Sequence, residues 1–216
     1  MNKTLLVLVV LFCSAKICNA QYFNAGFRLG ANFCQIDGDR MSGYNMGGIV
    51  GGVFVTYHFS SKWEGQFEML YSQKGSQRVI QDTSQNNGLW DLLRINYIEV
   101  PVIVNYILSK KIKLSGGLGI ADMMGNLFES RANIELRNVD FVTKYEFSGT
   151  VGTQYYLTPK LSIFGRFTYS LIGINKPNGN IPYFTNATAF YIYDGGMANN
   201  VISFGLCYSM LNGAKN

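Results

Sequence analysis

The chain has 216 residues, of which 14% are aromatic and 14% charged, and its formal net charge is +5. This length suits a single domain, and the basic residues stand singly along the chain, which gives no basis for a nucleic-acid partner. Beyond the N-terminal segment no stretch has the length of a transmembrane helix, because even Ile98–Leu108 is interrupted by polar residues and a proline. A membrane-spanning form of this chain would therefore cross the bilayer as strands.

The first residues have the features of a cleaved secretory signal. Lys3 provides a basic start, Leu5–Phe12 contains no polar residue, and small residues stand at the −3 and −1 positions before Gln21. A membrane anchor would need roughly 18 apolar residues, and a serine and a lysine interrupt this run. We predict a signal peptide over residues 1–20 and one domain over residues 21–216.

A period-two alternation of apolar and polar residues follows and recurs about eight times. From Phe23 to Phe33 every odd residue is apolar and every even residue is polar or glycine, which indicates a strand with one apolar face. Similar segments occupy about Met46–Phe59, Trp63–Gly75, Arg94–Leu108, Ile112–Ala121, Val139–Leu157, Leu161–Leu171 and Val201–Leu211.

The connections alternate between short and long. Three are tight turns, Ser60–Lys62, Ser109–Lys111 and Thr158–Lys160, and four are long, Gln35–Asn45, Ser76–Leu93, Met123–Asn138 and Ile172–Asn200. Short turns on one side and long loops on the other are typical of outer-membrane barrels. The sequence therefore predicts an all-β fold: an eight-stranded antiparallel up-and-down transmembrane β-barrel with short periplasmic turns and long extracellular loops, located in the cell outer membrane.

A soluble eight-stranded barrel would show the same alternation with its apolar face inside. The signal peptide, the strands longer than the usual ~5–6 residues and the aromatic residues near strand ends favour the membrane form. Two residues break the pattern: Pro101 lies inside a predicted strand, where we expect a bulge, and Phe164 falls on a polar face.

Two cysteines, Cys34 and Cys207, follow the signal peptide and lie in the first and last predicted strands. These strands would be neighbours at the barrel seam, but Cys34 would lie at the outer rim and Cys207 nearer the middle of its strand. The separation favours two free thiols over a disulfide.

Three segments together resemble the PorT-like outer-membrane β-barrel family of Gram-negative bacteria. They are Gly26–Phe33, Phe67–Gly75 with its Glu-x-Leu-Tyr-Ser-x-Lys-Gly run, and Tyr97–Pro101. The resemblance implies an eight-stranded barrel, no known catalytic residues and, for the founding member, a role in a protein-secretion apparatus. The chain departs from such barrels at its end, where Leu211–Asn216 stands in place of a final aromatic residue.

The inward positions carry charges of both signs: Arg28, Glu64, Glu68, Lys74, Glu99, Lys113, Lys144, Glu146 and Arg166. Eight strands leave an interior just wide enough for side chains, and buried charges need partners. We predict a network of ion pairs that fills the lumen; the alternative is a narrow polar conduit or a proton-linked switch. Glu68 and Glu99 could form an acid pair, although pairing with Arg28, Lys74 or Arg166 is favoured.

An enzyme is not expected. A lipid-modifying enzyme would need a base near the outer rim or membrane face, and His58, the only histidine, is predicted at the periplasmic end. No His/Cys cluster has metal-binding spacing, and Asp37–Asp39 lacks the remaining ligands of a calcium loop. We expect no cofactor and no metal.

The long loops are the expected sites of interaction, because binding residues usually lie on loops held by a rigid scaffold. The last loop contains the aromatic residues Tyr183, Phe184, Phe190, Tyr191 and Tyr193, which either extend neighbouring strands or form a contact surface. The leading hypothesis is a non-enzymatic envelope or secretion-associated interaction or structural protein. Its partners would be outer-membrane lipid and an envelope or secretion-complex protein. The alternatives are a narrow pore or small-solute carrier and, less favoured, a lipid-modifying enzyme.

Overall fold

The computed structural model describes residues 23–39, 41, 43–79, 90–130, 134–137, 140–176 and 196–210. Within them the strands are β1 (Phe23–Asp37), β2 (Met46–His58), β3 (Trp63–Val79), β4 (Trp90–Ile107), β5 (Ile112–Ser130), β6 (Ile134–Arg137), β7 (Tyr145–Tyr156), β8 (Leu161–Ser170) and β9 (Ala198–Ser209). No helix in this part of the chain is long and apolar enough to cross a membrane. The predicted signal peptide lies outside the described residues and stays a prediction.

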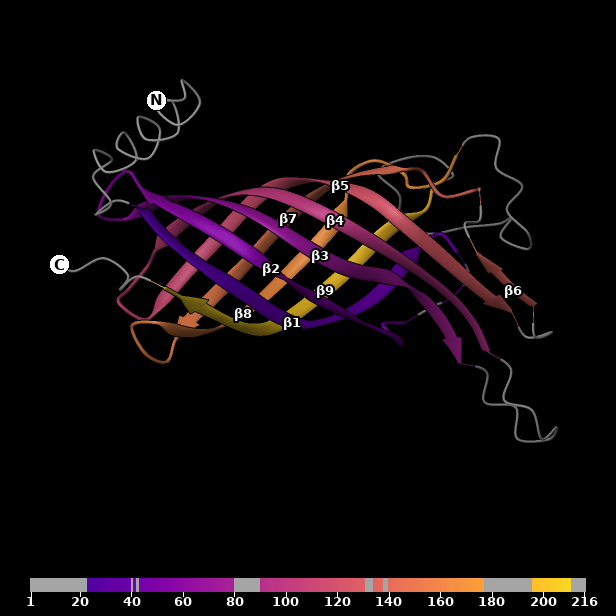
Figure 1. Ribbon diagram of the computed structural model, residues 1–216, viewed down its shortest axis with the longest axis horizontal. Helices are drawn as coiled ribbons and strands as arrows, with labels where there is room; N and C mark the ends of the chain where they lie inside the picture. Colours follow the sequence, from indigo (N-terminus) through magenta and orange to yellow (C-terminus); the bar gives the residue numbers. More distant parts are fainter. Residues whose placement is uncertain are drawn as a thin grey trace, which may run out of the picture.

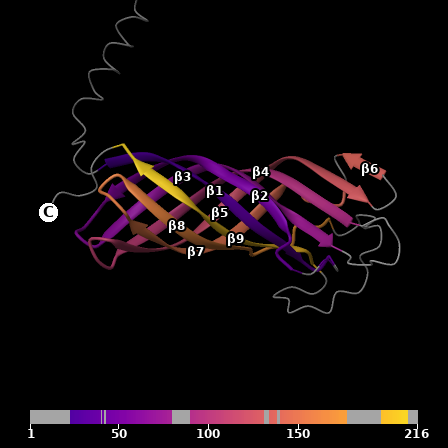
Figure 2. The same cartoon turned by 90° about the horizontal axis from the view of Figure 1, so that it is seen from below.

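Eight of these strands form a closed ring. The pairing order is β4-β3-β2-β1-β9-β8-β7-β5, and β4 also pairs with β5, which closes the barrel. All the pairings are antiparallel. The short β6 pairs with the far end of β5, and Figures 1 and 2 show it beyond the barrel wall. The predicted eight-stranded antiparallel barrel is confirmed.

The apolar residues face outward. On β1, Leu29 is 67% exposed while the adjacent Arg28 is 5% exposed, and the outward residues of the other strands follow the same rule, with Val53, Phe67, Val102 and Leu118 all exposed. A soluble barrel would bury this face and expose the other. A hydrophobic outer surface around a polar interior is instead the arrangement of a barrel surrounded by lipid.

Three strands extend further than the alternation predicts. β3 continues to Val79, β4 begins at Trp90 and β5 runs to Ser130, all inside predicted long loops, and β6 forms a hairpin with β5. The backbone ladder does not depend on side-chain type, whereas strict alternation is required only where one face meets lipid. Pairing can therefore continue beyond the last alternating residue.

The expected bulge at Pro101 is not found there. Phe67 pairs with Val102 and Leu70 with Glu99, so the register is the same on both sides of the proline. A proline interrupts the ladder by lacking an N–H and does not by itself require an extra residue. The register shift occurs instead between Asn96 and Tyr97, opposite β5.

Candidate functional site

The middle of the lumen is occupied by Glu68 and two arginines. Arg166 Nη1 and Nη2 donate to the two carboxylate oxygens of Glu68 at 2.7 and 2.9 Å, a bidentate pair. Arg28 Nη2 lies 3.3 Å from Glu68 Oε1. All three side chains are buried. β1, β3 and β8 bring them together because each residue falls on the inward face of its strand.

Phe164 lies beside this group and explains its departure from the alternation. Its side chain is 5% exposed and points inward, and the centre of the Arg28 guanidinium is 4.3 Å from the centroid of its ring. Next to them is a cavity of about 10 Å³, lined in part by Lys74, Glu99 and Arg166. This space is about the minimum needed to hold one water molecule.

Lys74 is the centre of a second charged group nearer the outer end. Its Nζ lies 2.5 Å from Glu99 Oε1 and donates to both carboxylate oxygens of Glu146 at 3.1 Å. The Ser170 hydroxyl donates to Glu146 Oε1 at 2.7 Å and accepts from the backbone N–H of Asn199. The group therefore links β3, β4 and β7 across the barrel.

A third group lies at the end of the lumen where the short turns are. Glu64 Oε2 is 2.6 Å from Lys113 Nζ, and Glu64 Oε1 is 2.6 Å from His58 Nε2. Above it, Gln66 donates to Glu68, while Thr56 and Asn105 donate to the Gln66 carbonyl oxygen. These polar side chains extend the first group toward the third.

Eight of the nine charged residues expected inside the barrel lie in these three groups. Lys144 does not: its side chain is 62% exposed, and its nearest acidic partner is Asp122 at 3.9 Å. β7 begins at Tyr145, so Lys144 precedes the strand and has no inward position to occupy. Glu68 and Glu99 do not form an acid pair, because each is held by cations.

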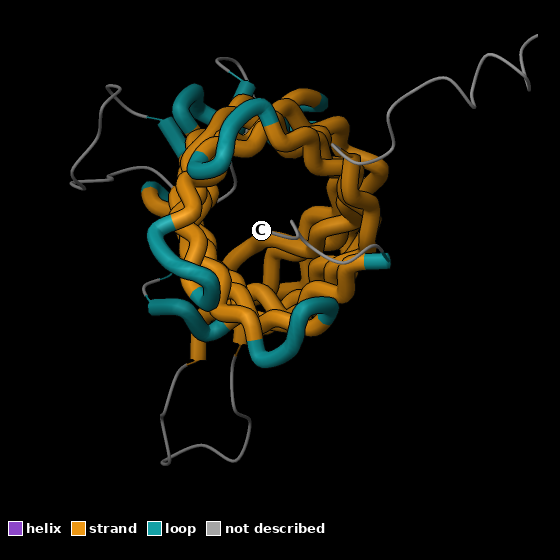
Figure 3. Tube along the Cα trace, turned by 90° about the vertical axis from the view of Figure 1, so that its left-hand side faces the viewer, coloured by secondary structure: helices purple, strands orange, loops and turns teal. Residues whose placement is uncertain are grey.

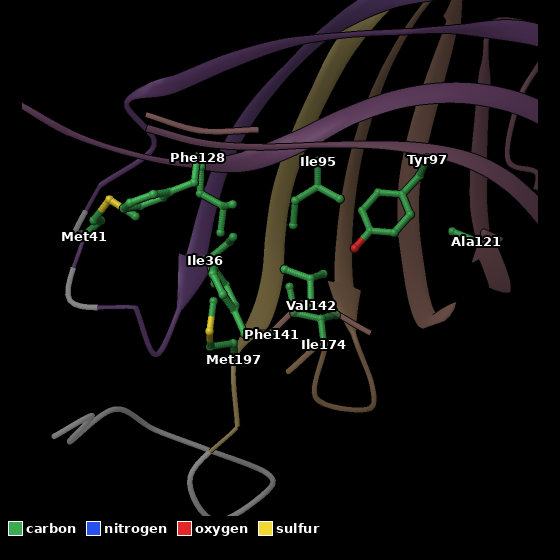
Figure 4. Packing of buried hydrophobic residues seen from close by; sticks show 11 residues of the cluster. Ile36, Met41, Ile95, Tyr97, Ala121, Phe128, Phe141, Val142, Ile174 and Met197 are labelled. Atoms are coloured by element: carbon green, nitrogen blue, oxygen red, sulfur yellow. The ribbon is translucent and has the colours of Figure 1, made fainter. Parts of the chain in front are cut away.

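The outer mouth of the barrel is closed by an apolar cluster, here called the mouth cluster (Figure 4): Ile36, Met41, Leu93, Ile95, Tyr97, Ala121, Phe128, Phe141, Val142, Ile174 and Met197. Two connecting segments meet within it. Val142 and Asn175 form an isolated β-bridge, and Thr143 N–H donates to Ile174 O at 2.7 Å. These segments precede β7 and follow β8, so their pairing continues that of the two neighbouring strands at the outer end.

The mouth cluster was not expected from the sequence. Phe141 was predicted to face lipid within a strand starting at Val139, but it is 4% exposed and packs inward. The alternation is interrupted at Val142 and Thr143, where residues 141–143 pair with residues 174–176. The break in the alternation marks this position, and the pairing with residues 174–176 accompanies the inward orientation of Phe141.

Asp39 is buried in the connection that follows β1. Its Oδ1 accepts a hydrogen bond from the backbone N–H of Met41, a member of the mouth cluster, at 2.8 Å. Burial raises the pKa of the Asp39 carboxyl to about 7, although Ser76 and Arg78 oppose the shift. Asp39 is therefore a titratable group within an apolar region outside the membrane.

The remaining sequence predictions concern the cysteines, metal binding and the aromatic residues of the last loop. Cys34 and Cys207 are free, buried thiols; Cys34 pairs with Val201 and Arg28 with Cys207, which places the cysteines far apart along the seam. In the described ranges no group of His, Cys, Asp or Glu side chains could hold a metal ion. The loop aromatics Tyr183, Phe184, Phe190, Tyr191 and Tyr193 lie outside the described residues.

Comparisons with known proteins agree with this architecture. Residues 5–209 match the family model of the outer membrane protein beta-barrel domain. Among solved structures, Ail, the attachment invasion locus protein of Yersinia pestis, is 14% identical with a TM-score of 0.51, and the match covers 88% of this chain and 99% of Ail. Neisserial surface protein A is 11% identical with a TM-score of 0.47, covering 87% of this chain and 96% of that protein. No curated protein matches the sequence.

Ail shares the fold with this chain, and the family match extends over most of the chain's length. The narrower assignment to the PorT-like family stays a prediction. The chain belongs to the outer membrane protein beta-barrel domain family and is a protein of the outer membrane.

Proposed function

We propose that this protein is a non-enzymatic, PorT-like barrel that serves as an interaction or structural component of the cell envelope, in a secretion-associated assembly, through its extracellular loops. The observation that carries the proposal is the closed outer mouth above a filled lumen. A barrel built in this way offers its partners a surface and not a passage.

The mouth cluster supports this role because it joins the bases of several outer connections. Met41 follows β1, Phe141 precedes β7, and Ile174 and Met197 lie between β8 and β9. Burying these side chains together fixes the ends of the loops to one rigid core, and loops on a rigid scaffold commonly carry binding sites.

The PorT-like part of the proposal is supported by the two sequence runs that carry the resemblance. Phe67–Gly75 lies on β3 and Tyr97–Pro101 on β4, and these strands are paired. The lysine of the first run and the glutamate of the second form the Lys74–Glu99 ion pair. The two runs therefore describe one structural unit in the lumen.

The two alternatives have less support. A narrow pore or carrier requires a continuous passage, whereas the lumen holds three ion-paired groups and a cavity of about 10 Å³. Discrete single-channel currents from the purified protein in a planar bilayer at neutral pH would favour the pore. A lipid-modifying enzyme would need His58 free to act as a base at the outer rim, but His58 contacts Glu64 at the opposite end.

The experiment for the leading proposal is crosslinking in native outer membranes followed by pull-down. One variant replaces residues 178–194 with a Gly-Ser linker, which retains Ile174 and Met197 and so the mouth cluster. A matched control replaces residues 81–88 in the connection between β3 and β4. We expect the first variant to fold and insert but to lose crosslinked partner proteins that the wild type and the control capture. An unchanged set of crosslinked proteins in the first variant would contradict the proposal.

A further inference from the structure

The three short turns share one local sequence. Residues 59–62, 108–111 and 157–160 read Phe-Ser-Ser-Lys, Leu-Ser-Lys-Lys and Leu-Thr-Pro-Lys. Each turn therefore has an apolar residue first, a hydroxyl residue second and a lysine last. Short turns face the periplasm in outer-membrane barrels, so these turns form the periplasmic rim.

The hydroxyl and the backbone complete each turn. Ser60 Oγ accepts from the N–H groups of Lys62 at 3.3 Å and Trp63 at 3.1 Å. Ser109 and Thr158 make the same pair of bonds in their own turns. In each turn the first two N–H groups also donate to the carbonyl of the residue that follows the turn. No atom of a lysine side chain takes part, so the turn geometry does not explain the repeated lysine.

The four lysine side chains of these turns have no acidic partner among the described residues. Lys62, Lys110 and Lys111 are exposed and Lys160 is half-buried, and none of them forms an ion pair with a described residue. The three turns contain no acidic residue. At the outer end, by contrast, Lys144 lies 3.9 Å from Asp122.

The turns are distributed around the barrel and border its apolar surface. They join β2 to β3, β4 to β5 and β7 to β8, and Figure 3 views the barrel from this end. The first residue of each turn is an exposed apolar side chain, and Trp63, also exposed, directly follows Lys62. Each lysine therefore lies within three residues of the lipid-facing surface, at the level where phospholipid headgroups meet a barrel.

We propose that these four lysines, the lysine rim, bind the headgroups of anionic phospholipids in the periplasmic leaflet. A lysine beside a membrane attracts anionic lipid, and its alkyl stem can lie along apolar surface while the ammonium reaches the phosphate. Each turn begins with an exposed apolar side chain within three residues of its lysine, which places the ammonium groups at the bilayer surface and favours lipid over an acidic protein.

Trp63 provides a local probe for this proposal. It pairs with Tyr106, so it lies between the turn at 59–62 and the turn at 108–111. The chain has two tryptophans, and Trp90→Phe leaves Trp63 as the only one. Quenching of its fluorescence is compared in bilayers that contain the same fraction of either brominated phosphatidylglycerol or brominated phosphatidylethanolamine. We expect local enrichment of phosphatidylglycerol on the order of fivefold, and equal quenching by the two lipids would overturn the proposal.

Two charge-matched variants separate the lysine rim from general charge. Lys110→Gln combined with Lys111→Gln should reduce the preference for phosphatidylglycerol by about twofold or more. Lys144→Gln combined with Lys176→Gln removes the same charge at the outer end and should leave the preference unchanged. Equal effects of the two double variants would reject the lysine rim as the cause.

Ionic strength tests the wild-type protein without any substitution in the lysine rim. At about 1 M salt the Debye length falls to about 3 Å, and the preference for phosphatidylglycerol should disappear; a preference that persists would contradict an electrostatic site.

Binding to isolated peptidoglycan tests whether the lysine rim has a different ligand. If the wild type binds it, the rim variant does not, and the lipid preference is the same in both, the rim serves the cell wall and the proposal fails.

Discussion

The guanidinium of Arg28 lies over the ring of Phe164, 4.3 Å from its centroid. Phe164 is the one residue of β8 that departs from the expected alternation, and this contact gives the departure a structural reason. The ring covers one side of the buried guanidinium while Glu68 holds its edge. An aromatic side chain on the polar face thus fills volume that small polar residues would leave empty.

Glu68→Gln is expected to destabilise the protein strongly. Glu68 is the only acidic residue within ion-pair distance of Arg28 and Arg166 among the described residues, and removing it leaves two buried cations uncompensated. We expect a loss of about 3–5 kcal/mol, measured as the free energy of unfolding in urea with the protein in lipid vesicles. Lys144→Gln, at an exposed ion pair, should change stability by less than about 1 kcal/mol. Similar losses in both variants would contradict the assigned difference between lumen and surface.

Substitution by alanine should affect the stability of the barrel differently at two glycines of β2. A Cβ on Gly52 would lie 2.0 Å from the Met69 carbonyl oxygen and 2.8 Å from Leu70 Cα, whereas a Cβ on Gly47 would have no heavy atom within 4 Å. Gly52→Ala should therefore cost about 1–3 kcal/mol, while Gly47→Ala should be neutral or slightly stabilising. The urea midpoints of the two variants check this; a stable Gly52→Ala barrel would show that β2 and β3 are further apart than described.

Asp39 predicts a pH dependence of stability near neutrality. The pKa of its carboxyl is raised from 3.8 to about 7 in the folded protein, so its contribution is fully favourable below about pH 4 and is lost as the pH rises to about 7. The unfolded chain releases its proton first, and the total loss has an upper limit of about 4 kcal/mol. Asp39→Asn keeps an oxygen for the Met41 N–H and should abolish this component.

The measurement is the difference in unfolding free energy between wild type and Asp39→Asn as a function of pH. Taking the difference cancels the titration of other groups. We expect the variant to gain stability relative to wild type between about pH 4 and pH 7. A constant difference over this range would show that Asp39 has an ordinary pKa.

The two cysteines should resist thiol reagents in the folded protein. Cys34 and Cys207 are buried and free, so a maleimide should label neither in the native barrel and both after unfolding without a reductant. Intact-mass spectrometry counts the labels. A chain that remains unlabelled after unfolding would contain a disulfide, contrary to the separation of the two residues along the seam.

Much of the barrel follows from local sequence, because lipid on one side and a narrow lumen on the other impose a period of two. This pattern correctly placed Arg28, Glu68 and Arg166 inside. It could not give their partners: Lys74 binds Glu146, 72 residues away, and that contact depends on the stagger of strands around the whole ring.

Apart from the bulge expected at Pro101, the mispredicted parts lie beyond the membrane. There the alternation no longer reports which side faces lipid, and tertiary contacts decide the orientation. Phe141 turns inward because its segment pairs with residues 174–176, and Lys144 precedes its strand for the same reason. The three repeated turns were visible in the sequence, but their shared lysine became informative only when the hydrogen bonds showed that the turns do not need it.

The two central charge groups differ in net charge. Arg28 and Arg166 share the carboxylate of Glu68, which gives the first group an excess positive charge. Lys74 contacts two carboxylates, which gives the second group, nearer the outer end of the barrel, an excess negative charge. The lumen thus contains a built-in dipole whose two ends stabilise each other at short range. Neutralising one residue from each group together, such as Arg28 and Glu99, would erase this dipole and keep the total charge, which no single substitution can do.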